Sequence, residues 1–434
     1  METKVSLARP LAVDLFAGAG GLSLGLEQAG FEVAAAVEHD PIHAAVHEYN
    51  FPNSTMFCRD VTALTGSAIR DGSPIGAREI ELVAGGPPCQ GFSLIGKRAL
   101  DDPRNALLAQ FARLVDELRP RYFLLENVAG LTVGNHRQLL DEVVQMMGAA
   151  GYDTLLPHKV LQAADFGTPQ SRRRLVLLGA RRGVPIPWYP EPLCAPRRID
   201  GSPLQATLPG ELPAGPSVWE ALGDLPDADQ FAELLAGDQV RADFGRPSGY
   251  AAALRAVAPA GDDFSHPRNF RPDWLTSSAR TVHSAESVRR FAATPPGATE
   301  KVSRFLRLHP DGICNTLRAG TASDRGAHTA PRPIHPTRPR VLTVREAARL
   351  HGYPDWFRFH VTKWNGFRQL GNSVPAQLGR AVGSAVLRAD GITPTRGDLV
   401  RLGRPELLSF NATEALRHFG IARRVIPQRA RKAA

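Results

Sequence analysis

The chain has 434 residues and a formal net charge of +9, and arginine supplies most of the positive excess. That length accommodates a large α/β core with a second domain, and no apolar run is long enough to span a membrane, so we expect no membrane partner. The four cysteines form no CxxC pair, so neither a zinc knuckle nor a disulfide framework is suggested and a reduced, cytoplasmic compartment is favoured. The charge favours a polyanion such as nucleic acid, although a GC-rich genome would also enrich arginine.

The first third of the chain alternates short β-rich runs with amphipathic helical stretches, the pattern of a doubly wound parallel α/β sheet. Each run ends in a carboxylate or in a cysteine turn. The runs are 11–13 before Asp14, 33–37 before Glu38, 56–58 before Asp60, 82–84 before the turn at Cys89, and 122–125 before Glu126. Because ligands of open α/β sheets bind at the carboxyl ends of strands, we expect these groups to converge on one cleft. A further core strand is expected at 174–179.

One cysteine stands on a tight turn, in the run Pro87-Pro88-Cys89-Gln90. The two prolines fix the backbone and donate no hydrogen bonds, so the Cys89 sulfur is predicted to point away from the core. Considered alone, Cys89 is more simply explained as a small buried hydrophobe, as most free cysteines are. The acids at the other strand ends favour a reactive thiol instead.

A glycine-rich turn, DLFAGAGG, occupies residues 14–21 between the first strand and the first helix. Such a turn lets backbone amides approach a ligand at a helix N-terminus, although a plain structural turn is the alternative. The dinucleotide pattern GxGxxG fails, because the sixth position counted from Gly18 is Ser23. Glu38 suits a ribose diol, and Asp60 could accept a hydrogen bond from an adenine amino group. These features together predict an adenosine ligand without phosphates.

Six blocks give the chain a close resemblance to the bacterial-type DNA cytosine-5 methyltransferases, in the order and spacing of that family. They are DLFAGAGGLSLGL (14–26), GGPPCQGFS (85–93), ENV (126–128), QSRRR (170–174), LTVREAARLHGYPDWF (342–357) and RQLGNSVPAQLGRAVG (368–383). The resemblance implies a seven-stranded Rossmann-like domain, S-adenosylmethionine as methyl donor, no metal, and duplex DNA as substrate. It also implies a variable, loop-rich target-recognition domain, and the composition does change to proline, glycine and arginine from about residue 183. A helix is predicted at 344–350 and another at 376–387.

The domain organisation implied by this resemblance has four parts. The catalytic domain begins with 1–187 and is completed by a return segment at 341–390. The target-recognition domain occupies 188–340, and a Thr-Leu pair at 316–317 resembles one found in such domains. Residues 391–434 form a basic C-terminal extension beyond the family core.

The resemblance also assigns chemical roles to residues that match the blocks. Cys89 would be the thiolate that adds to cytosine carbon 6 and activates carbon 5 toward a methyl sulfonium, and a thiol needs nearby positive charge to ionise readily. Glu126 would bridge ring nitrogen 3 and the exocyclic amine. Arg174 would contact the cytosine carbonyl and Arg172 would position the cleft, with a plain phosphate-binding cluster as the alternative. The base must leave the duplex stack, and the loop 93–104 would close over it.

The implied cofactor contacts come from both ends of the catalytic domain, and His39 stands where relatives often carry a tryptophan that stacks on adenine. The cofactor positions are Phe16, Ala17, Gly18, Gly21, Glu38, Asp60, Val61, Pro88, Leu107, Asn372 and Ser373.

Three other functions compete with this interpretation. A tRNA cytosine-5 methyltransferase shares the fold, but the recognition segment of about 150 residues and the GFS after PCQ favour DNA. A nucleotide-dependent oxidoreductase is disfavoured by the missing GxGxxG, and a catalytically silent DNA-binding protein by the intact Cys89, Glu126 and Arg174. We expect a monomer associated with the nucleoid, and a restriction endonuclease acting on the same sequence is a candidate partner.

Overall fold

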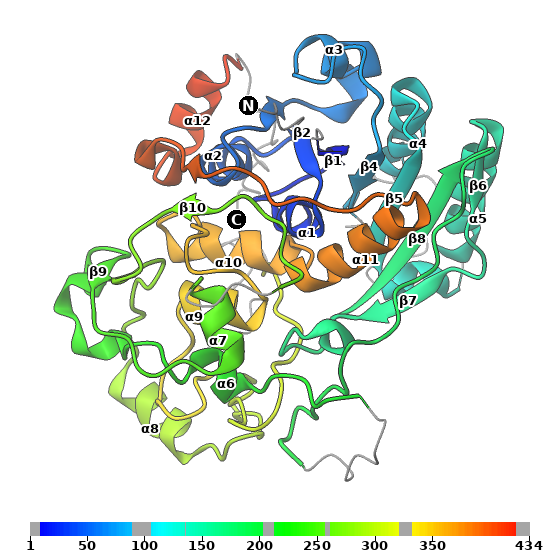
Figure 1. Cartoon of the computed structure of the whole chain (residues 1–434). Helices are drawn as coiled ribbons and strands as arrows, with labels where there is room; N and C mark the ends of the chain where they lie inside the picture. The colour runs from blue at the N-terminus through cyan, green and yellow to red at the C-terminus, as the bar shows by residue number, and fades with distance from the viewer. Residues whose placement is uncertain are drawn as a thin grey trace, which may run out of the picture.

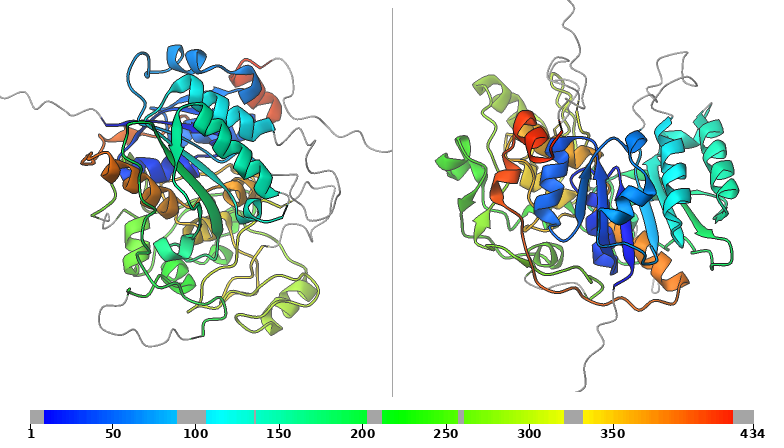
Figure 2. Two further views of the ribbon diagram at one scale, coloured as in Figure 1. Left: turned by 90° about the vertical axis from the view of Figure 1, so that its right-hand side faces the viewer. Right: turned by 90° about the horizontal axis from the view of Figure 1, so that it is seen from above.

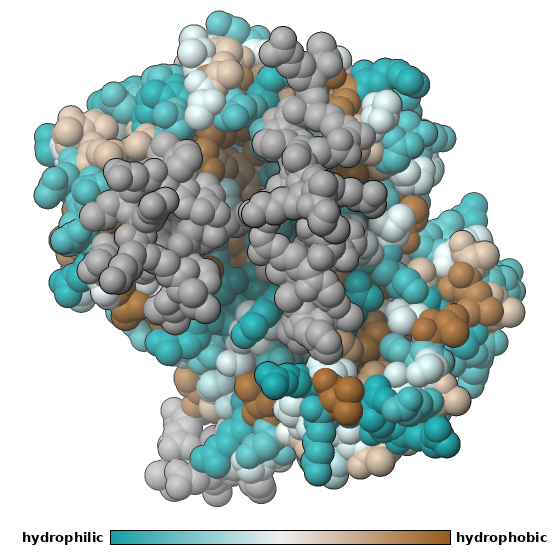
Figure 3. All heavy atoms as spheres, turned by 180° about the vertical axis from the view of Figure 1, so that it is seen from behind, coloured by the Kyte–Doolittle hydropathy of each residue, from teal (hydrophilic) through white to brown (hydrophobic). Residues whose placement is uncertain are grey.

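The structure is a computed structural model, and it describes residues 9–88, 106–134, 136–202, 212–256, 261–320 and 332–421. A twisted sheet flanked by helices forms one lobe, and short helices joined by long loops form a second lobe beside it (Figure 1). Within the described ranges, no helix is long and apolar enough to cross a membrane. On the part of the face that Figure 3 draws in colour, hydrophobic residues lie in patches among hydrophilic ones.

The main sheet has the strand order β3-β2-β1-β4-β5-β8-β6, with β7 also paired to β8. The first five strands are parallel, and β8 runs antiparallel to β5, β6 and β7. The strands are β1 (Leu11–Leu15), β2 (Glu32–Glu38), β3 (Thr55–Cys58), β4 (Leu82–Gly85), β5 (Tyr122–Val128), β6 (Tyr152–Thr154), β7 (Lys159–Gln162) and β8 (Arg173–Arg181). This arrangement confirms the doubly wound, Rossmann-like fold.

The sheet has eight strands where seven were expected, because the partner of β8 is divided into β6 and β7. Pro157 lies in the interruption between them, and a proline has no N–H to donate to a sheet ladder. The antiparallel direction of β8 was not predicted from the sequence, because direction depends on the connections before a strand and not on its own residues.

Both faces of the sheet are covered, because successive residues of each strand point to opposite sides. Val83 and Leu125 pack with α3, α4 and α5 in one hydrophobic cluster, whereas Ala84 and Leu124 pack with α1 and α11 in another. Figure 2 shows these helices around the strands. The helices are α1 (Gly21–Ala29), α3 (Gly66–Asp71), α4 (Ala106–Leu118), α5 (His136–Ala149) and α11 (Ala376–Ala389). α11, the last helix of the predicted return segment, packs along α1 and so belongs to the first lobe.

The second lobe contains few regular elements, as its composition predicts. They are α6 (Val218–Leu222), α7 (Gly249–Leu254), α8 (Ala285–Ala293), β9 (Val240–Arg241), β10 (Arg268–Asn269) and β11 (Trp274–Leu275). The predicted helix at 344–350 is present as α9 (Val344–Leu350), and it begins at a capping box in which Thr343 and Glu346 accept from each other's backbone amides. The helix α10 (Lys363–Asn372) follows it.

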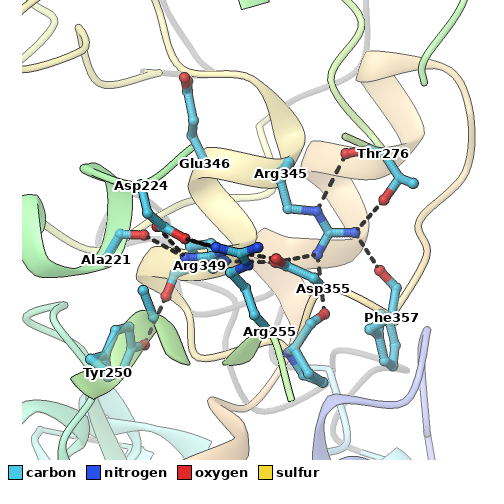
Figure 4. A network of polar contacts seen from close by, with 12 residues as sticks. Ala221, Asp224, Tyr250, Arg255, Thr276, Arg345, Glu346, Arg349, Asp355 and Phe357 are labelled. Atoms are coloured by element: carbon cyan, nitrogen blue, oxygen red, sulfur yellow. Dashed lines mark hydrogen bonds and ion pairs between the residues drawn. The ribbon is translucent and has the colours of Figure 1, made fainter. Parts of the chain in front are cut away.

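A buried ion-pair network fastens α9 to the second lobe (Figure 4). The Arg349 guanidinium lies between the carboxylates of Asp224, at 3.0 Å, and Asp355, at 2.6 Å. The side chains of Arg349 and Asp224 are both 0% exposed. One turn earlier, Arg345 donates to the backbone oxygen of Phe357 at 2.7 Å. The network therefore fixes the return segment against the lobe that precedes it in sequence.

The described part of the C-terminal extension, 391–421, is folded onto the rest of the molecule. It contains β12 (Val400–Arg401), a 3-10 turn at Pro405–Leu408 and α12 (Ala412–His418). β12 pairs with β10, and the last two elements lie against α2 (Pro41–Asn50), as the red and blue ribbons of Figure 1 show. The residues that make the end of this extension basic, Arg423, Arg424, Arg429, Arg431 and Lys432, lie outside the described residues.

Candidate functional site

A cavity of about 570 Å³ opens at the carboxyl ends of the central strands. Its walls come from the glycine-rich turn, the β2–α2 turn, residues 86–88, the ends of β5 and α10, and the start of β8. Fourteen residues predicted for the site line it: Phe16, Ala17, Gly18, Gly21, Glu38, Asp60, Val61, Pro88, Leu107, Glu126, Arg172, Arg174, Asn372 and Ser373. Cys89, with the loop 93–104, lies outside the described residues, and the preceding Pro88 lines the cavity. Residues more than 350 positions apart in sequence therefore share one site.

The glycine-rich turn is built around the Glu38 carboxylate. Glu38 Oε2 accepts from the Gly18 amide at 2.8 Å, and Oε1 accepts from the Asp40 amide at 2.7 Å. Phe16 adopts a left-handed φ of 61°, a sparsely populated conformation for a residue other than glycine. Such strain concentrates at ligand sites, where the surrounding structure holds it in place. The turn and β2 are thus locked together along one wall of the cavity.

Glu126 and Arg174 form an ion pair on another wall. Arg174 Nε lies 2.8 Å from Glu126 Oε1, and each side chain is only 12% exposed. The pair joins β5 to β8, because Asn127 and Val128 pair with Leu175 and Arg174 in the antiparallel ladder. The pairing holds the carboxylate at a fixed place in the cavity.

Gly86 supplies the space that the Glu126 carboxylate occupies. A Cβ built on Gly86 would lie 2.9 Å from Glu126 Oε2, closer than real Cβ atoms approach an oxygen. The second position of the GGPPCQ block is therefore glycine for a steric reason, because any side chain there would collide with the Glu126 carboxylate. The sequence pattern did not reveal this reason.

The Arg172 guanidinium hydrogen-bonds to backbone carbonyl oxygens. Its two terminal nitrogens donate to the carbonyl oxygens of Leu317, Gly371 and Ser373 at 2.7 to 2.9 Å. The side chain is buried, and burial together with the nearby Arg174 holds its pKa well below the usual value for an arginine. Leu317 belongs to the segment before the return helices, so Arg172 ties three distant parts of the chain together. These contacts favour the predicted role of Arg172 in positioning the cleft over the phosphate-binding alternative.

The cysteines within the described residues, Cys58, Cys194 and Cys314, are all buried, and none lines the cavity. Burial raises the pKa of the Cys58 thiol to about 12, and it raises the thiol pKa of Cys194 and Cys314 as well. A thiol of raised pKa is a poor nucleophile at neutral pH. None of these three cysteines suits nucleophilic catalysis.

Several further residues to which the sequence assigned no specific role line the cavity, although Asp14 was among the strand-end acids expected at the cleft. Burial raises the pKa of Asp14 to about 7, and its Oδ2 accepts from the Ser23 hydroxyl at 2.6 Å. Arg368 pairs with Asp40 at 3.1 Å. Burial disfavours the charged form of Asp40, but His43, Arg368 and two backbone amides outweigh it and hold its pKa below the usual value.

The sequence contained a signal for Asp14 and for Arg368. Asp14 ends the first predicted strand, and Arg368 opens the RQLGNSV block. His39, Asn127 and Gln369 also line the cavity.

The family model described as C-5 cytosine-specific DNA methylase matches residues 12–241 and 250–388. The chain belongs to this family. Family membership confirms the resemblance drawn from the six blocks, and it identifies the protein as a DNA (cytosine-5)-methyltransferase. It removes the oxidoreductase alternative.

Two relatives of this C-5 DNA methylase are named type II methyltransferases, a name associated with restriction–modification. M.XorII of Xanthomonas oryzae pv. oryzae is 53% identical over 98% of this chain and 96% of the relative. M1.HphI of Haemophilus parahaemolyticus is 30% identical over 84% of this chain and 82% of the relative. A crystal structure from E. coli, described as a prophage-encoded DNA modification methyltransferase, has a TM-score of 0.67 and 33% identity. It covers 88% of this chain and 99% of that one.

Proposed function

We propose that this C-5 DNA methylase transfers a methyl group from S-adenosylmethionine to carbon 5 of a flipped-out cytosine, within a specific duplex DNA sequence, through a covalent Cys89 adduct. The observation that carries the proposal is the shared cavity. It brings the Glu126–Arg174 pair, the residue before Cys89 and the predicted cofactor positions to the carboxyl ends of the strands.

The cavity suits an adenosine carrying a cationic chain. Five carboxylates line it, those of Asp14, Glu38, Asp40, Asp60 and Glu126, and in their ionised form they would repel the pyrophosphate of a dinucleotide. Glu38 sits at the end of β2, where an acid binds a ribose diol in nucleotide folds. Bound S-adenosylmethionine supplies an electrophilic methyl group on a sulfonium. We assign Phe16, Ala17, Gly18, Gly21, Glu38, Asp60, Val61, Pro88, Leu107, Asn372 and Ser373 to its binding.

The chain's own residues would activate the cytosine. The Cys89 thiolate would add to carbon 6, and Glu126 would hydrogen-bond nitrogen 3 and the exocyclic amine, offsetting the charge that develops on the ring. Arg174 would bind the cytosine carbonyl while keeping Glu126 in place through the 2.8 Å contact. After methyl transfer, a proton leaves carbon 5 and the thiolate departs from carbon 6.

The remaining assignments concern the substrate DNA. We propose that 188–340 reads the target sequence, because Thr316 and Leu317 are tied directly to the QSRRR block. Thr316 Oγ1 donates to the Ser171 carbonyl at 2.5 Å, and the Leu317 amide donates to Gln170 at 3.2 Å. The relatives' type II names support a cognate endonuclease as partner.

Methylation with isotope-labelled S-adenosylmethionine tests the proposal, with duplex DNA and tRNA as competing substrates. We expect label in DNA, at carbon 5 of cytosine, and none in tRNA. Cys89→Ala should lose methyl transfer and keep cofactor binding. Label in tRNA alone, or a Cys89→Ala variant with a tenth of the wild-type turnover, would contradict the proposal.

A further inference from the structure

The described C-terminal extension, 391–421, lies beyond the residues that the family model matches, which end at 388. It is nevertheless shared with M.XorII, whose similarity covers 98% of this chain. The DNA methylase fold already has its sheet, helices and cavity without these residues. What the extension contacts therefore indicates what it adds.

The first contact is hydrophobic and falls on α2. Leu407 and Leu408, each 2% exposed, form one buried cluster with Ala45, Val46 and Tyr49 of α2. The same cluster contains Ala19 of the glycine-rich turn, and it is extended by the partly buried Leu402, Phe410 and Phe419. The extension thus supplies the apolar partners for one face of α2.

Backbone contact brings the extension against α2 at Gly403. The Gly403 amide donates to the Tyr49 carbonyl at 2.8 Å. A Cβ at Gly403 would lie 2.9 Å from the Tyr49 Cα and 3.2 Å from the Glu48 carbonyl oxygen, so a larger residue cannot approach as closely. Farther along, His418 Nε2 lies 2.9 Å from Glu48 Oε2.

The extension is anchored at its other end to the second lobe. β12 forms a parallel ladder with β10, in which Arg268 pairs with Val400. The backbone oxygen of Asp398 lies 2.9 Å from His266 Nδ1. The chain between these anchors and α12 spans the distance from the second lobe to α2, as the orange-to-red ribbon of Figure 1 shows. Both ends of the segment are held, so it can brace the helix between them.

The opposite end of α2 forms a wall of the cofactor cavity. Asp40 caps the helix through the amides of Ile42 and His43, and its own amide donates to Glu38. Asp40, His43 and Glu38 all line the cavity. A rigid helix transmits a shift at Tyr49 to this capping turn, because the two ends lie within ten residues of one helix.

We propose that residues 391–421 act as a brace that positions α2, and through it the Glu38–His43 turn, for cofactor binding. The inference rests on the proposed function, in that S-adenosylmethionine is taken as the ligand of the cavity. Leu407, Leu408 and Gly403 are positioning residues in this account, since they act through α2 and do not line the cavity.

Leu408→Asp in the full chain tests the brace, and Leu399→Asp is its matched control. Leu399 belongs to the same extension, but it is 66% exposed. Loss of a preorganised wall weakens binding without altering the reacting groups, so we expect Leu408→Asp to raise the KM for S-adenosylmethionine about tenfold. The kcat and the KM for duplex DNA should stay within about twofold of wild type. Leu408→Met should restore the cofactor KM, because the two side chains have similar volume.

Direct binding of S-adenosylhomocysteine, measured by calorimetry, gives a second readout that does not need turnover. Its Kd should rise by the same factor in Leu408→Asp and stay unchanged in Leu399→Asp. Gly403→Val, a milder perturbation, covers the case in which Leu408→Asp does not fold, and it should raise the same Kd severalfold. An unchanged cofactor Kd in folded Leu408→Asp or Gly403→Val would overturn the brace, as would a fall in kcat with KM unaltered. Failure of the wild type to bind S-adenosylhomocysteine would instead contradict the proposed function.

Discussion

Gly86→Ala tests whether the fixed position of the Glu126 carboxylate controls the chemical step. The new Cβ would lie 2.9 Å from Glu126 Oε2, and the carboxylate is held on its other oxygen by Arg174 Nε at 2.8 Å. The carboxylate cannot keep both contacts. Either it moves away from Gly86 or the β4 turn does, and both change the distance between Glu126 and the turn that leads to Cys89.

The size of the effect follows from the contact distances. Restoring ordinary van der Waals separation requires a shift of about 0.5 Å, and a misplacement of about 1 Å can cost about a hundredfold in rate. We therefore expect kcat to fall about tenfold. Gly86 has no left-handed φ, so alanine is compatible with its backbone, and any fall in melting temperature should come from the displaced Glu126–Arg174 pair and not from backbone strain.

Single-turnover methylation of duplex DNA with saturating labelled cofactor measures the chemical step directly. Gly130→Ala is the matched control, because Gly130 follows the same strand as Glu126 and has open space around its Cβ position. A wild-type single-turnover rate in Gly86→Ala would refute the reasoning. So would an equal loss of rate in Gly130→Ala.

Three further predictions concern buried charge. Asp224→Asn should lower the free energy of unfolding by about 1.5–3 kcal/mol, because the fully buried Arg349 loses a charged hydrogen-bond partner but keeps Asp355. Asp273→Asn, in an exposed ion pair, should lower it by less than about 1 kcal/mol, and denaturant titration measures both values. Arg172→Met should lower the melting temperature more than Arg172→Lys, because three buried carbonyl oxygens lose their donor. Burial and the neighbouring Asp390 raise the pKa of Glu81 to about 8, so the folded state holds this proton more tightly than the unfolded state. The stability that protonated Glu81 contributes is fully present below the pKa of this group in the unfolded chain, and it is lost as the pH rises to about 8. The melting temperature of the wild type should therefore fall relative to that of Glu81→Gln across this pH range. A difference in melting temperature that does not change with pH would contradict the raised pKa.

The sequence predicted the sheet and most of the cavity, because both follow from local patterns. Strand-end acids such as Asp14 and Glu38 are visible as breaks after apolar runs, and parallel strands bring their carboxyl ends to one edge. Glu126 and Arg174 were each predicted as site residues, but the contact between them was not predicted. It depends on the antiparallel register of β5 and β8, which no local pattern encodes.

The C-terminal brace escaped prediction for a related reason. Leu407 and Leu408 are adjacent and show no helical or strand period, and their partners on α2 lie more than 350 residues earlier. The different contacts of Arg172 and Arg174 could also be predicted only in part from the sequence. Arg172 directly precedes β8 and Arg174 lies in it, and both line the cavity. Their partners differ, because Arg172 donates to the backbone of distant segments whereas Arg174 contacts Glu126, and no local pattern encodes that difference.

The covalent step is tested most directly with 5-fluorocytosine at the target position of a duplex. After methyl transfer, carbon 5 must lose its original substituent before the thiolate can leave, and fluorine cannot depart as a cation. We expect a protein–DNA adduct that survives denaturant, requires S-adenosylmethionine and is absent in Cys89→Ala, with the nucleotide on the peptide that contains residues 87–93. An adduct on Cys58, Cys194 or Cys314, or turnover of the fluorinated DNA without any trapped species, would contradict the account.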